Sequence, residues 1–391
     1  MKRCGDAALW GSQSWLQPAF SRLSSPAQPP VSAARDAPER TVRRSCERLL
    51  LFAALLLAGC GRYADFTLPP IPGGDPNLTF AFDERPEPVL GRSSGFDSQD
   101  AMAPSVITWW GPGLLNFYSG YDGATWRTGE AFSMDGIRWK SGGAAFLAPD
   151  PHTWEGSYIA GNGSVVVGFD DSGPGARRDA FWYYYVAGPR NAGRIGLARS
   201  RIGHALRKEP TPVLQNGPFE SWDERAVADP YVVHIHPYFY LYYLGQDRAD
   251  PPRQRLGVAR STDGFHWEKL RANPILEPGP PGSFDEAGDG EPAVWQSNGY
   301  YWMLFTGRDF SEIRRLGLAR STDGVHWTKL PAVFSGTQAW DSKVICDPTV
   351  VVKDGEIRVW FGGGDVASPD ENLHGQIGFA VLRPVNATLA K

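Results

Sequence analysis

The chain has 391 residues, of which 42% are hydrophobic and 13% aromatic, and its formal net charge is −4. This length and apolar content suit a large folded core and exclude an intrinsically disordered chain. The mildly acidic balance excludes a nucleic-acid-binding surface, which needs clustered basic residues.

An apolar segment near the N-terminus predicts export. Residues 43–60 read RRSCERLLLFAALLLAGC, with a basic start, an apolar run and small residues before Cys60. This order is typical of a secretion signal and is too short to span a bilayer comfortably. The ending LAGC resembles the lipobox of bacterial lipoproteins, and a plain signal peptide or anchor is the alternative. We expect a signal at 43–59, a lipid on Cys60 and a place in the bacterial cell envelope, at the outer membrane or the periplasmic face.

Residues 1–42 show no period of 2 or 3.6, and we interpret them as an over-extended gene start with Val42 as the true initiator. Residues 1–59 contain eight Lys or Arg and four Asp or Glu, so their removal changes the charge from −4 to −8. Cys346 is then the remaining thiol beside the lipidated Cys60, so no disulfide framework is expected. We interpret Cys346 as a small buried apolar side chain and not as a nucleophile.

Five copies of one sequence pattern follow, each starting with an aromatic residue and an acid. Successive aromatics stand 58, 68, 62 and 56 residues apart, and they are Phe96, Trp154, Trp222, Phe284 and Trp340. Each start precedes an apolar strand such as YFYLYYLGQD and then a segment such as RLGVARSTDGFHWEKL. The Asp-Gly pair in that segment predicts a tight hairpin into a further strand.

Four short antiparallel strands per unit, repeated five times with no helical period, predict an all-β fold, the five-bladed β-propeller. The fifth unit ends early, at QIGFAVLRPVN, and residues 80–90 resemble the fourth-strand segment 266–276. We therefore expect a propeller domain over residues 79–391 whose ring is closed by the N-terminal strand. Residues 60–78, rich in Pro and Gly, are then expected to be a tether from the lipid.

Acids that recur in every unit are explained by what every unit needs, which is packing and turn geometry. We interpret two sets as structural, together with His266 and His326. The first set follows the aromatics and the second lies in the Asp-Gly turns: Asp97, Glu155, Asp223, Asp285 and Asp341, then Asp135, Asp263 and Asp323.

The position seven residues after the aromatic behaves differently, because it changes from unit to unit. It reads Ala103, Gly161, Asp229, Glu291 and Asp347. This position begins the innermost strand, so we expect its side chains to line a central funnel. Crowded carboxylates separate one another's pKa values, and glycosidic bond cleavage requires one ionised and one protonated carboxyl. The longer Glu lets an acid reach a leaving oxygen; simple drift between Asp and Glu is the alternative interpretation.

The segments ADPYVV and GEPAVW, 62 residues apart in consecutive units, resemble the third- and fourth-blade motifs of the five-bladed propeller glycosidases in glycoside hydrolase families 43 and 32. The resemblance covers the architecture of residues 80–391. It implies Glu291 as the general acid and Asp229 as the carboxylate that orients the substrate and tunes the acid. Residues 160–166, AGNGSVV, resemble the Gly-Ser segment of blade two in the invertase group, which implies a substrate contact at Asn162.

Those families place a base or nucleophile Asp before the proline of blade one, where this chain has Ala103. The candidates for the missing base or nucleophile are Asp100 and Asp97 of unit one and Asp347 of unit five. If Asp347 does not take this role, we expect it to contact the substrate. In a five-fold ring, equivalent positions two blades apart are roughly 1.6 times as far from each other as those of neighbouring blades. Inverting glycosidases need the wider separation, about 6.5–9.5 Å between the two carboxyl groups, so that a water molecule fits between them and the sugar. This geometry favours Asp100 or Asp97 with Glu291 in an inverting route.

Loops after the second strand of each unit are expected to rim the same mouth. Trp126 stacks on a sugar ring or packs on its own loop, and Arg308, with Arg314 or Arg315, is placed to hold an anion. His374 in ENLHGQIG resembles a blade-five histidine that helps to hold a central calcium ion or water in some family 43 enzymes, and an ordinary loop residue is the alternative. No other cofactor and no protein metal cluster is expected.

The sequence favours an exported, lipid-anchored and monomeric glycoside hydrolase that acts on an oligo- or polysaccharide. A glycoside phosphorylase would explain Ala103, because phosphate replaces water and a protein base becomes unnecessary. A non-catalytic carbohydrate-binding propeller is the third interpretation, since a fold does not establish an activity.

Overall fold

The computed structural model describes residues 63–109, 111–170, 178–201 and 206–386. The expected gene-start extension 1–42, the signal 43–59 and Cys60 lie outside these ranges. Within them the chain consists of strands β1–β21 and one 3-10 turn, η1 (Ala339–Asp341), which confirms the all-β prediction. No helix in the described ranges has the length and apolar character needed to cross a membrane.

The strands form five repeats, named here one to five, and neighbouring strands within a repeat pair antiparallel. Repeat one contains β3 (Asp100–Thr108), β4 (Leu114–Tyr121), β5 (Trp126–Ser133) and β6 (Lys140–Leu147). Repeat two contains β7 (Ile159–Asp170), β8 (Arg178–Gly188), β9 (Arg194–Arg201) and β10 (Arg207–Lys208). Repeat three contains β11 (Ala226–Ile235), β12 (Tyr238–Gln246), β13 (Gln254–Ser261) and β14 (Glu268–Leu270). Repeat four contains β15 (Gly288–Ser297), β16 (Tyr300–Arg308), β17 (Arg314–Ser321) and β18 (Thr328–Phe334). Repeat five contains β19 (Val344–Lys353), β20 (Glu356–Gly364), β21 (Gln376–Asn386) and the N-terminal strand β2 (Leu78–Glu84).

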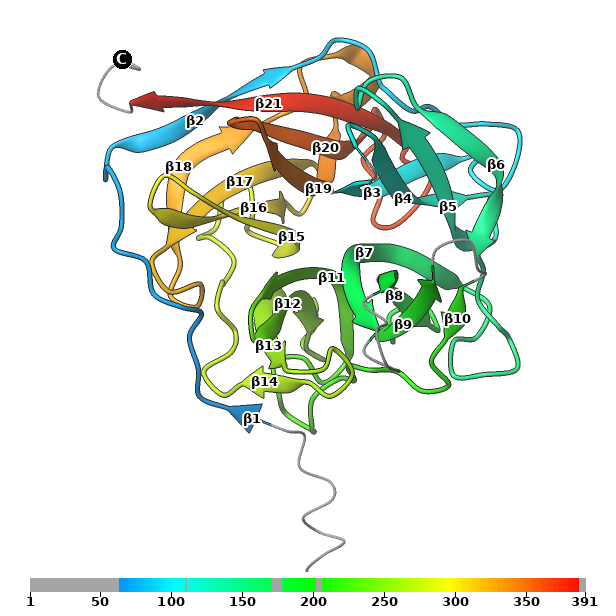
Figure 1. Ribbon diagram of the computed structural model, residues 1–391, viewed down its shortest axis with the longest axis horizontal. Coiled ribbons are helices and arrows are strands. Elements are labelled where there is room, and N and C mark those ends of the chain that lie inside the picture. The colour runs from blue at the N-terminus through cyan, green and yellow to red at the C-terminus, as the bar shows by residue number, and fades with distance from the viewer. Residues whose placement is uncertain (1–62, 110, 171–177, 202–205, 387–391) are drawn as a thin grey trace, which may run out of the picture. The chain divides into compact units, whose positions relative to one another are not determined.

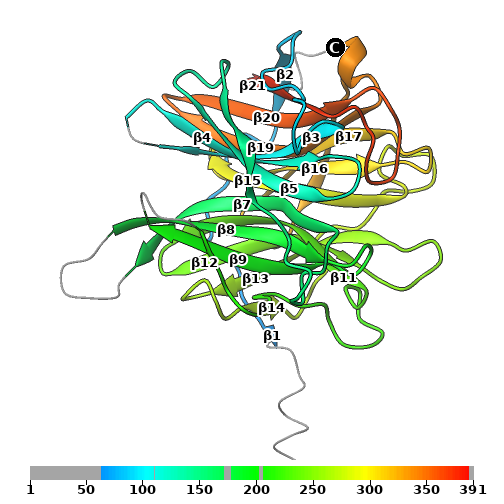
Figure 2. The ribbon, with the colours of Figure 1, turned by 90° about the vertical axis from the view of Figure 1, so that its right-hand side faces the viewer.

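The first strands of the repeats lie next to one another. Contacts run from β3 to β7, β11, β15 and β19 in turn, and β19 also contacts β3. In Figure 1 these five strands lie nearest the centre of the view. Hydroxyl groups join some of them: Ser105 Oγ accepts a hydrogen bond of 2.8 Å from Val165 N, and Ser164 Oγ accepts one of 3.0 Å from Val232 N. Figure 2 shows the strands of repeat two, β7, β8 and β9, lying side by side as one layer.

The aromatic residue that starts each pattern packs over glycines of the following strands. In repeat three, a Cβ added to Gly245 or Gly257 would lie 2.2 or 2.5 Å from the Trp222 ring. In repeat four, Phe284 covers Gly307 in the same way, at 2.3 Å. The aromatic and the glycine therefore require each other, which is why both recur along the chain.

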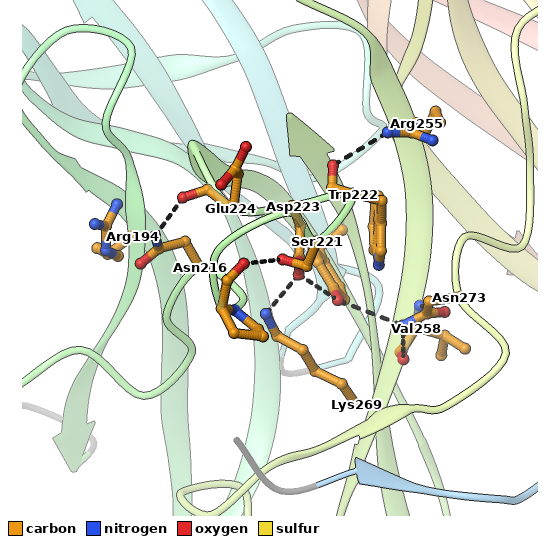
Figure 3. Close-up of polar contacts among 12 residues, drawn as sticks. Arg194, Asn216, Ser221, Trp222, Asp223, Glu224, Arg255, Val258, Lys269 and Asn273 are labelled. Atoms are coloured by element: carbon orange, nitrogen blue, oxygen red, sulfur yellow. Dashed lines mark hydrogen bonds and ion pairs between the residues drawn. The ribbon is translucent and has the colours of Figure 1, made fainter. Parts of the chain in front are cut away.

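The acids after the aromatics are structural, as predicted. Glu155, Asp223 and Asp285 each form an ion pair of 2.5 Å with a lysine of the fourth strand, namely Lys208, Lys269 and Lys329 respectively. Figure 3 shows the Asp223 carboxylate with Lys269 reaching it from β14. Since both partners in that pair are buried, removal of either would leave an uncompensated charge.

The Asp-Gly turns also have the predicted structural role. Asp263 Oδ1 accepts hydrogen bonds from the backbone N–H groups of Phe265, at 2.9 Å, and His266, at 2.8 Å. The exposed ring of His266 lies 2.7 Å from the other Asp263 oxygen, and His326 repeats this arrangement with Asp323. Both histidines are therefore part of a turn.

The segment expected to be a free tether packs against the repeats from Tyr63 onward. Strand β1 (Tyr63–Ala64) pairs parallel with β14. Leu68 is fully buried, and its N–H donates a hydrogen bond of 2.8 Å to Asp323 O. Part of the expected tether 60–78 therefore packs on the repeats, since Phe66, Leu68 and Ile71 belong to a cluster of apolar residues from repeats three and four.

The N-terminal strand β2 supplies the fourth strand of repeat five, as the resemblance of residues 80–90 to 266–276 predicted, and Figure 1 shows it beside β21. The predicted register is wrong by one residue. Glu84, and not Asp83, stands opposite Ala380, just as Lys269 stands opposite Ala259. The physical reason is strand alternation: Glu84 shares a face with the buried Phe80, whereas Asp83 is exposed.

Repeat five consequently has an acid where three other repeats have a lysine. Thr337 donates to one Glu84 oxygen at 2.8 Å, and Gln338 N donates to one Asp341 oxygen at 2.9 Å. The remaining oxygens, Glu84 Oε1 and Asp341 Oδ2, are buried and have no donor among the described residues. Burial, and then the hydrogen bond and charge of Glu84, raise the pKa of Asp341 to about 8. Asp341 therefore keeps a proton near neutral pH and shares it with Glu84 through a hydrogen bond.

The shared proton makes the stability of repeat five depend on pH. The pKa of Asp341 is raised on folding from 3.8, so its contribution is fully present below about pH 4 and is lost as the pH rises towards 8. We predict that Glu84→Gln raises the free energy of unfolding by about 1–3 kcal/mol at pH 8, because the amide donates to Asp341, with no gain at pH 4. Thermal denaturation at both pH values measures this.

Asp83→Asn is the matched control for that variant. It removes the same charge from the adjacent residue of β2, where the carboxylate is exposed and pairs with Arg383 at 2.8 Å. We expect a small and pH-independent change in its melting temperature. A gain for Glu84→Gln that is equal at pH 4 and pH 8 would contradict the shared proton.

Candidate active site

Each inner strand is interrupted at the same place by a β-bulge whose first residue has left-handed backbone. Pairing shifts register there in β3, β7, β11, β15 and β19. Such residues cost about 1–3 kcal/mol each and bulges re-aim side chains, so their recurrence is characteristic of a functional site. The five residues and their φ angles are Ala103 (48°), Asn162 (46°), Asp229 (46°), Glu291 (51°) and Asp347 (50°).

The repeat-two member of this set differs from the sequence prediction. Gly161 was expected from its distance to Trp154, but the left-handed residue is Asn162. The prediction is wrong by one residue because the bulge lies eight residues after the aromatic in repeat two and seven in the other repeats. The amide that was expected as a substrate contact therefore lies at the same structural position as the acids.

Four of the bulge side chains meet in one cavity of about 170 Å³. They are Asn162, Asp229, Glu291 and Asp347, and all four also line a hollow of about 30 Å³ on the other side of the bulges. These side chains thus form a floor between the two hollows. Trp126, Arg308 and Arg314 line the larger cavity as well, so the structure brings together seven of the residues selected from the sequence.

The three carboxyl groups interact closely. Asp347 N donates a hydrogen bond of 3.0 Å to Glu291 Oε2. Burial first, and the charge of Glu291 second, raise the pKa of Asp229 to about 7, against the opposing hydrogen bond from Asn162. The same two causes, joined by Asp229, raise the pKa of Asp347 well above its ordinary range. Groups this close titrate together, so the cluster as a whole holds a proton near neutral pH.

Two arginines lie opposite each other on β16 and β17 and line the same cavity. Burial would lower the pKa of Arg314, but Cys346, Glu291 and Asp347 raise it above its usual value, so its charge is held firmly. Burial, followed by repulsion from Arg314, lowers the pKa of Arg308. Arg315, the third anion-binding candidate, lies 3.5 Å from Asp309 and does not line the cavity.

Several buried polar atoms of the cavity lining have no hydrogen-bond partner among the described residues. They are Asn162 Oδ1, Thr306 Oγ1 and Arg308 Nε. Buried polar groups are nearly always hydrogen-bonded in folded proteins. Donors and acceptors of this kind, gathered in one cavity, suit a ligand rich in hydroxyl groups.

Asp97 and Asp100, the candidate bases of repeat one, do not line the cavity. Asp97 is buried and accepts hydrogen bonds from Ser93 and, at 2.9 Å, from Tyr118. Asp100 is fully buried and accepts two backbone hydrogen bonds, of 2.7 and 2.8 Å, from the β20–β21 connection. The expectation of a base from repeat one is contradicted by this geometry, because the bulge that turns a side chain inward occurs at Ala103.

Trp126 and His374 have different outcomes. Trp126 stacks on Tyr121 with ring centroids 5.0 Å apart and is buried, and it also lines the cavity; its contact with a sugar stays a prediction. His374 is exposed, and its Nδ1 lies 2.8 Å from Asp365. His374 lies outside the residues that line the cavity.

The sequence reasoning missed the contribution of the β20–β21 connection, residues 365–375. Pro369, Asp370 and Leu373 line the cavity, and so does Tyr158 of repeat two. One sequence signal was available: this connection is longer than its counterpart 309–313 in repeat four. Long connections that do not add regular structure are commonly functional.

The all-β scaffold is built from repeated units, and its carboxylates converge on one cavity with polar atoms that suit a ligand rich in hydroxyl groups. These features are typical of a propeller-like protein of the glycoside hydrolase class. Comparison with family models agrees. Residues 116–342, more than half of the chain, match the glycosyl hydrolases family 32 N-terminal domain, and the chain belongs to that family. The resemblance to the propeller glycosidases drawn from ADPYVV and GEPAVW is thereby confirmed.

Similar sequences include two uncharacterized proteins of Mycobacterium tuberculosis, from strains CDC 1551 / Oshkosh and ATCC 25618 / H37Rv. Each is 30% identical over 191 residues, which are 44% of this chain and 62% of the relative. The match therefore spans less than two thirds of the length of these relatives.

Similar solved structures include one described as a glycoside hydrolase, with a TM-score of 0.61 and 18% identity, covering 79% of this chain and 95% of that one. A thermostable family-43 glycoside hydrolase gives a TM-score of 0.54 at 15% identity, covering 80% and 91%. A third structure is described as coming from the family 130 of mannoside phosphorylases, a family that contains glycoside hydrolases targeting β-1,2 mannosidic linkages in Candida mannan. Its TM-score is 0.56 at 15% identity, and the match covers 81% of this chain and 96% of that one. At these identities the likeness shows the fold alone.

The raised pKa of Asp229 predicts that the site destabilises the fold at neutral pH. Its contribution to stability is present below about pH 4 and is lost as the pH rises to about 7. Asp229→Asn should therefore raise the free energy of unfolding by about 1–3 kcal/mol at pH 8 and leave it nearly unchanged at pH 4. Urea denaturation at the two pH values tests this, and an unaltered or lower stability at pH 8 would refute it.

Proposed function

We propose that this protein cleaves glycosidic bonds of an oligo- or polysaccharide by acid–base chemistry. The observation that carries the proposal is the convergence of Asp229, Glu291 and Asp347 on one cavity through left-handed bulges, with Arg308 and Arg314 on its wall. We also propose that the five repeats are the blades of one closed five-bladed propeller. The cyclic contacts of the inner strands and the pairing of β2 with β21 support this closure.

Glu291 is the proposed proton donor to the leaving oxygen. It is the longest of the three acidic side chains on the cavity floor, and Asp347 N holds one of its oxygens. Asp229, hydrogen-bonded by the Asn162 amide, is proposed to position the substrate. This is the division of roles between two carboxyl groups that glycoside hydrolysis requires.

Asp347 is the proposed nucleophile, since Asp97 and Asp100 do not line the cavity. One carboxylate oxygen of Asp347 and one of Glu291 lie within 4.8 Å of each other, which is closer than the separation of about 6.5–9.5 Å in an inverting pair and near that of about 5–5.5 Å in a retaining pair. In the first step the C1–O bond breaks, the leaving oxygen takes the proton from Glu291, and an Asp347 oxygen bonds to C1. In the second step water oxygen bonds to C1, the bond from C1 to Asp347 breaks, and Glu291 takes the proton of that water, so the cluster ends with the number of protons with which it began.

A screen of 4-nitrophenyl furanosides and pyranosides, with and without phosphate, tests the activity. On levan or linear arabinan, whose leaving oxygen has to be protonated, we expect Glu291→Gln to lower kcat by about 100- to 10,000-fold without a comparable change in KM, because general acid catalysis accelerates by that factor. The loss should be smaller on 4-nitrophenyl glycosides, because 4-nitrophenolate leaves without a proton. Glu286→Gln is the matched control, since Glu286 belongs to the same repeat, lies outside the cavity and holds Gly282 N at 2.6 Å.

Equal turnover by wild type and Glu291→Gln would remove Glu291 from the mechanism. Absence of turnover on every probe, together with unchanged sugar binding in Glu291→Gln, would favour the non-catalytic carbohydrate-binding propeller.

A glycoside phosphorylase is the second candidate, favoured by Ala103 and by the paired arginines of the cavity. Phosphate oxygen would then bond to C1 while Glu291 protonates the leaving oxygen, so no protein base would be needed. Arg308 and Arg314 offer charge-assisted hydrogen bonds to such an anion. Turnover that disappears without phosphate and yields a sugar phosphate would identify this reaction; turnover independent of phosphate would identify the hydrolase.

We further propose that the mature protein is exported and anchored at the cell envelope through a lipid on Cys60. The sequence of residues 43–60 supports this proposal. Metabolic labelling with a fatty acid in a bacterial host, with Cys60→Ser as the control, separates lipidation from a plain signal peptide.

A further inference from the structure

The β20–β21 connection forms a strap across one side of the cavity. The strap, residues 366–375, contributes Pro369, Asp370 and Leu373 to the cavity lining. Within it, Ser368 Oγ donates a hydrogen bond of 2.7 Å to Glu371 O. The strap belongs to repeat five, but its other contacts are with three different repeats.

Repeat one holds the strap through Asp100. The carboxylate accepts hydrogen bonds from Asn372 N at 2.7 Å and Gly375 N at 2.8 Å, and Ala101 N donates to Gly375 O at 3.0 Å. Asp100 is fully buried, so it is a fixed anchor for the strap. Asp100, which the sequence suggested as a base, thus fastens the strap to repeat one. Repeat one is also the repeat whose bulge residue, Ala103, has no carboxylate.

Repeat two holds the strap through an ion-pair cluster. Arg190 pairs with Asp370 at 3.2 Å and with Glu371. Tyr158 donates a hydrogen bond of 3.2 Å to Glu371, and the Arg190 guanidinium lies 4.7 Å above the Tyr158 ring. Glu371 is mostly buried, whereas Arg190 is nearly half exposed, so the cluster can open more readily than the Asp100 anchor.

Repeat four completes the attachment through Arg314, which donates hydrogen bonds to Ser368 O at 3.1 Å and to Pro369 O. The strap therefore ties repeat five to repeats one, two and four around the cavity. Apart from the strap, most of the cavity wall comes from repeats two, three and four. The cavity, at about 170 Å³, is smaller than the 300–1,000 Å³ of sites that enclose drug-sized ligands, and it suits about one sugar ring.

We propose that the strap restricts the site to the end of a glycan chain, and that Arg190 is the specificity-determining residue that latches the strap in place. This inference rests on the proposed function. A chain passing through the cavity would have to cross the side of repeat one, which the strap and its Asp100 anchor cover. Loss of Arg190 would free residues 370 and 371 of the strap from repeat two, while the Asp100 anchor stays, and the strap could then shift enough to admit internal positions of a polymer.

A buried thiol reports on the strap independently of any activity. Leu373 of the strap packs in a small cluster with Met102, Val344 and Cys346. Cys346 is fully buried, and burial raises the pKa of its thiol well above the usual value, so it reacts only when the strap lifts. The rate of its alkylation therefore measures strap opening.

The test is alkylation of the full-length chain by N-ethylmaleimide, with Cys346 quantified in its own peptide by mass spectrometry. We expect Arg190→Gln to react about tenfold faster than wild type, the size of effect that loss of a charged hydrogen bond has on a local equilibrium. Arg248→Gln is the matched control, because Arg248 lies in the corresponding connection of repeat three, is exposed and pairs within its own repeat with Glu224 at 3.8 Å. Equal rates in Arg190→Gln and wild type would overturn the latch.

Glu371→Gln provides a second variant should Arg190→Gln fail to fold. In the double variant the two effects should combine to less than their product, since both substitutions remove the pair between Arg190 and Glu371. Specificity is then compared on dye-labelled levan and linear arabinan against the matching 4-nitrophenyl furanosides. We expect Arg190→Gln to raise the release of internal fragments relative to terminal sugar at least severalfold. Faster alkylation with an unchanged product ratio would overturn the role in specificity.

The two proposals fail separately. If wild type turns over none of these probes, the proposed function is contradicted, but the alkylation rates still decide whether Arg190 latches the strap. If turnover is found and the alkylation rates are equal, the function stands and the latch does not.

Discussion

The structure depends on a left-handed backbone turn that each inner strand makes at one position. A residue with positive φ lifts its side chain out of the normal strand alternation and leaves the ladder locally unpaired. In this protein the bulges point Asn162, Asp229, Glu291 and Asp347 at one cavity. Their strain, their mutual repulsion and their burial all oppose folding, and the packing of aromatic residues against glycines within the repeats offsets these costs.

The same carboxylate chemistry has opposite roles at the two ends of each repeat. Asp223 and Asp285 each lie 2.5 Å from a lysine, so their charges are compensated and they stabilise the scaffold. Asp229 and Asp347 lie among other carboxyl groups, and their pKa values are raised. In repeats three and four, a lysine therefore compensates the acid after the aromatic but not the acid at the bulge, a distinction that residue type alone does not reveal.

The repeats and the role of the recurring acids could be predicted from the sequence, because spacing and recurrence report on packing. The meeting of Asp229, Glu291 and Asp347 in one cavity could also be predicted, since equivalent positions of a repeat occupy equivalent places. The offset at Asn162 could not, because a bulge adds a residue without a sequence marker. The role of Asp100 as an anchor could not be predicted either. It depends on the path of the long β20–β21 connection, which has no equivalent of its length in the other repeats from which that path could be inferred.

The pairing of β2 with β21 has a consequence for how the chain reaches its native state. Residues 78–84 leave the ribosome before every repeat, whereas their partner, residues 380–386, follows the other strands of all five repeats. Strand β2 therefore waits for its partner until the repeats have been made, and among the described strand pairs this one has the largest sequence separation. Contacts of such high order slow folding, because the entropy of closing a long loop must be lost before the pairing is gained. Until then repeat five presents an unpaired β21 edge, which makes it the segment most exposed to wrong partners while the polypeptide is being assembled.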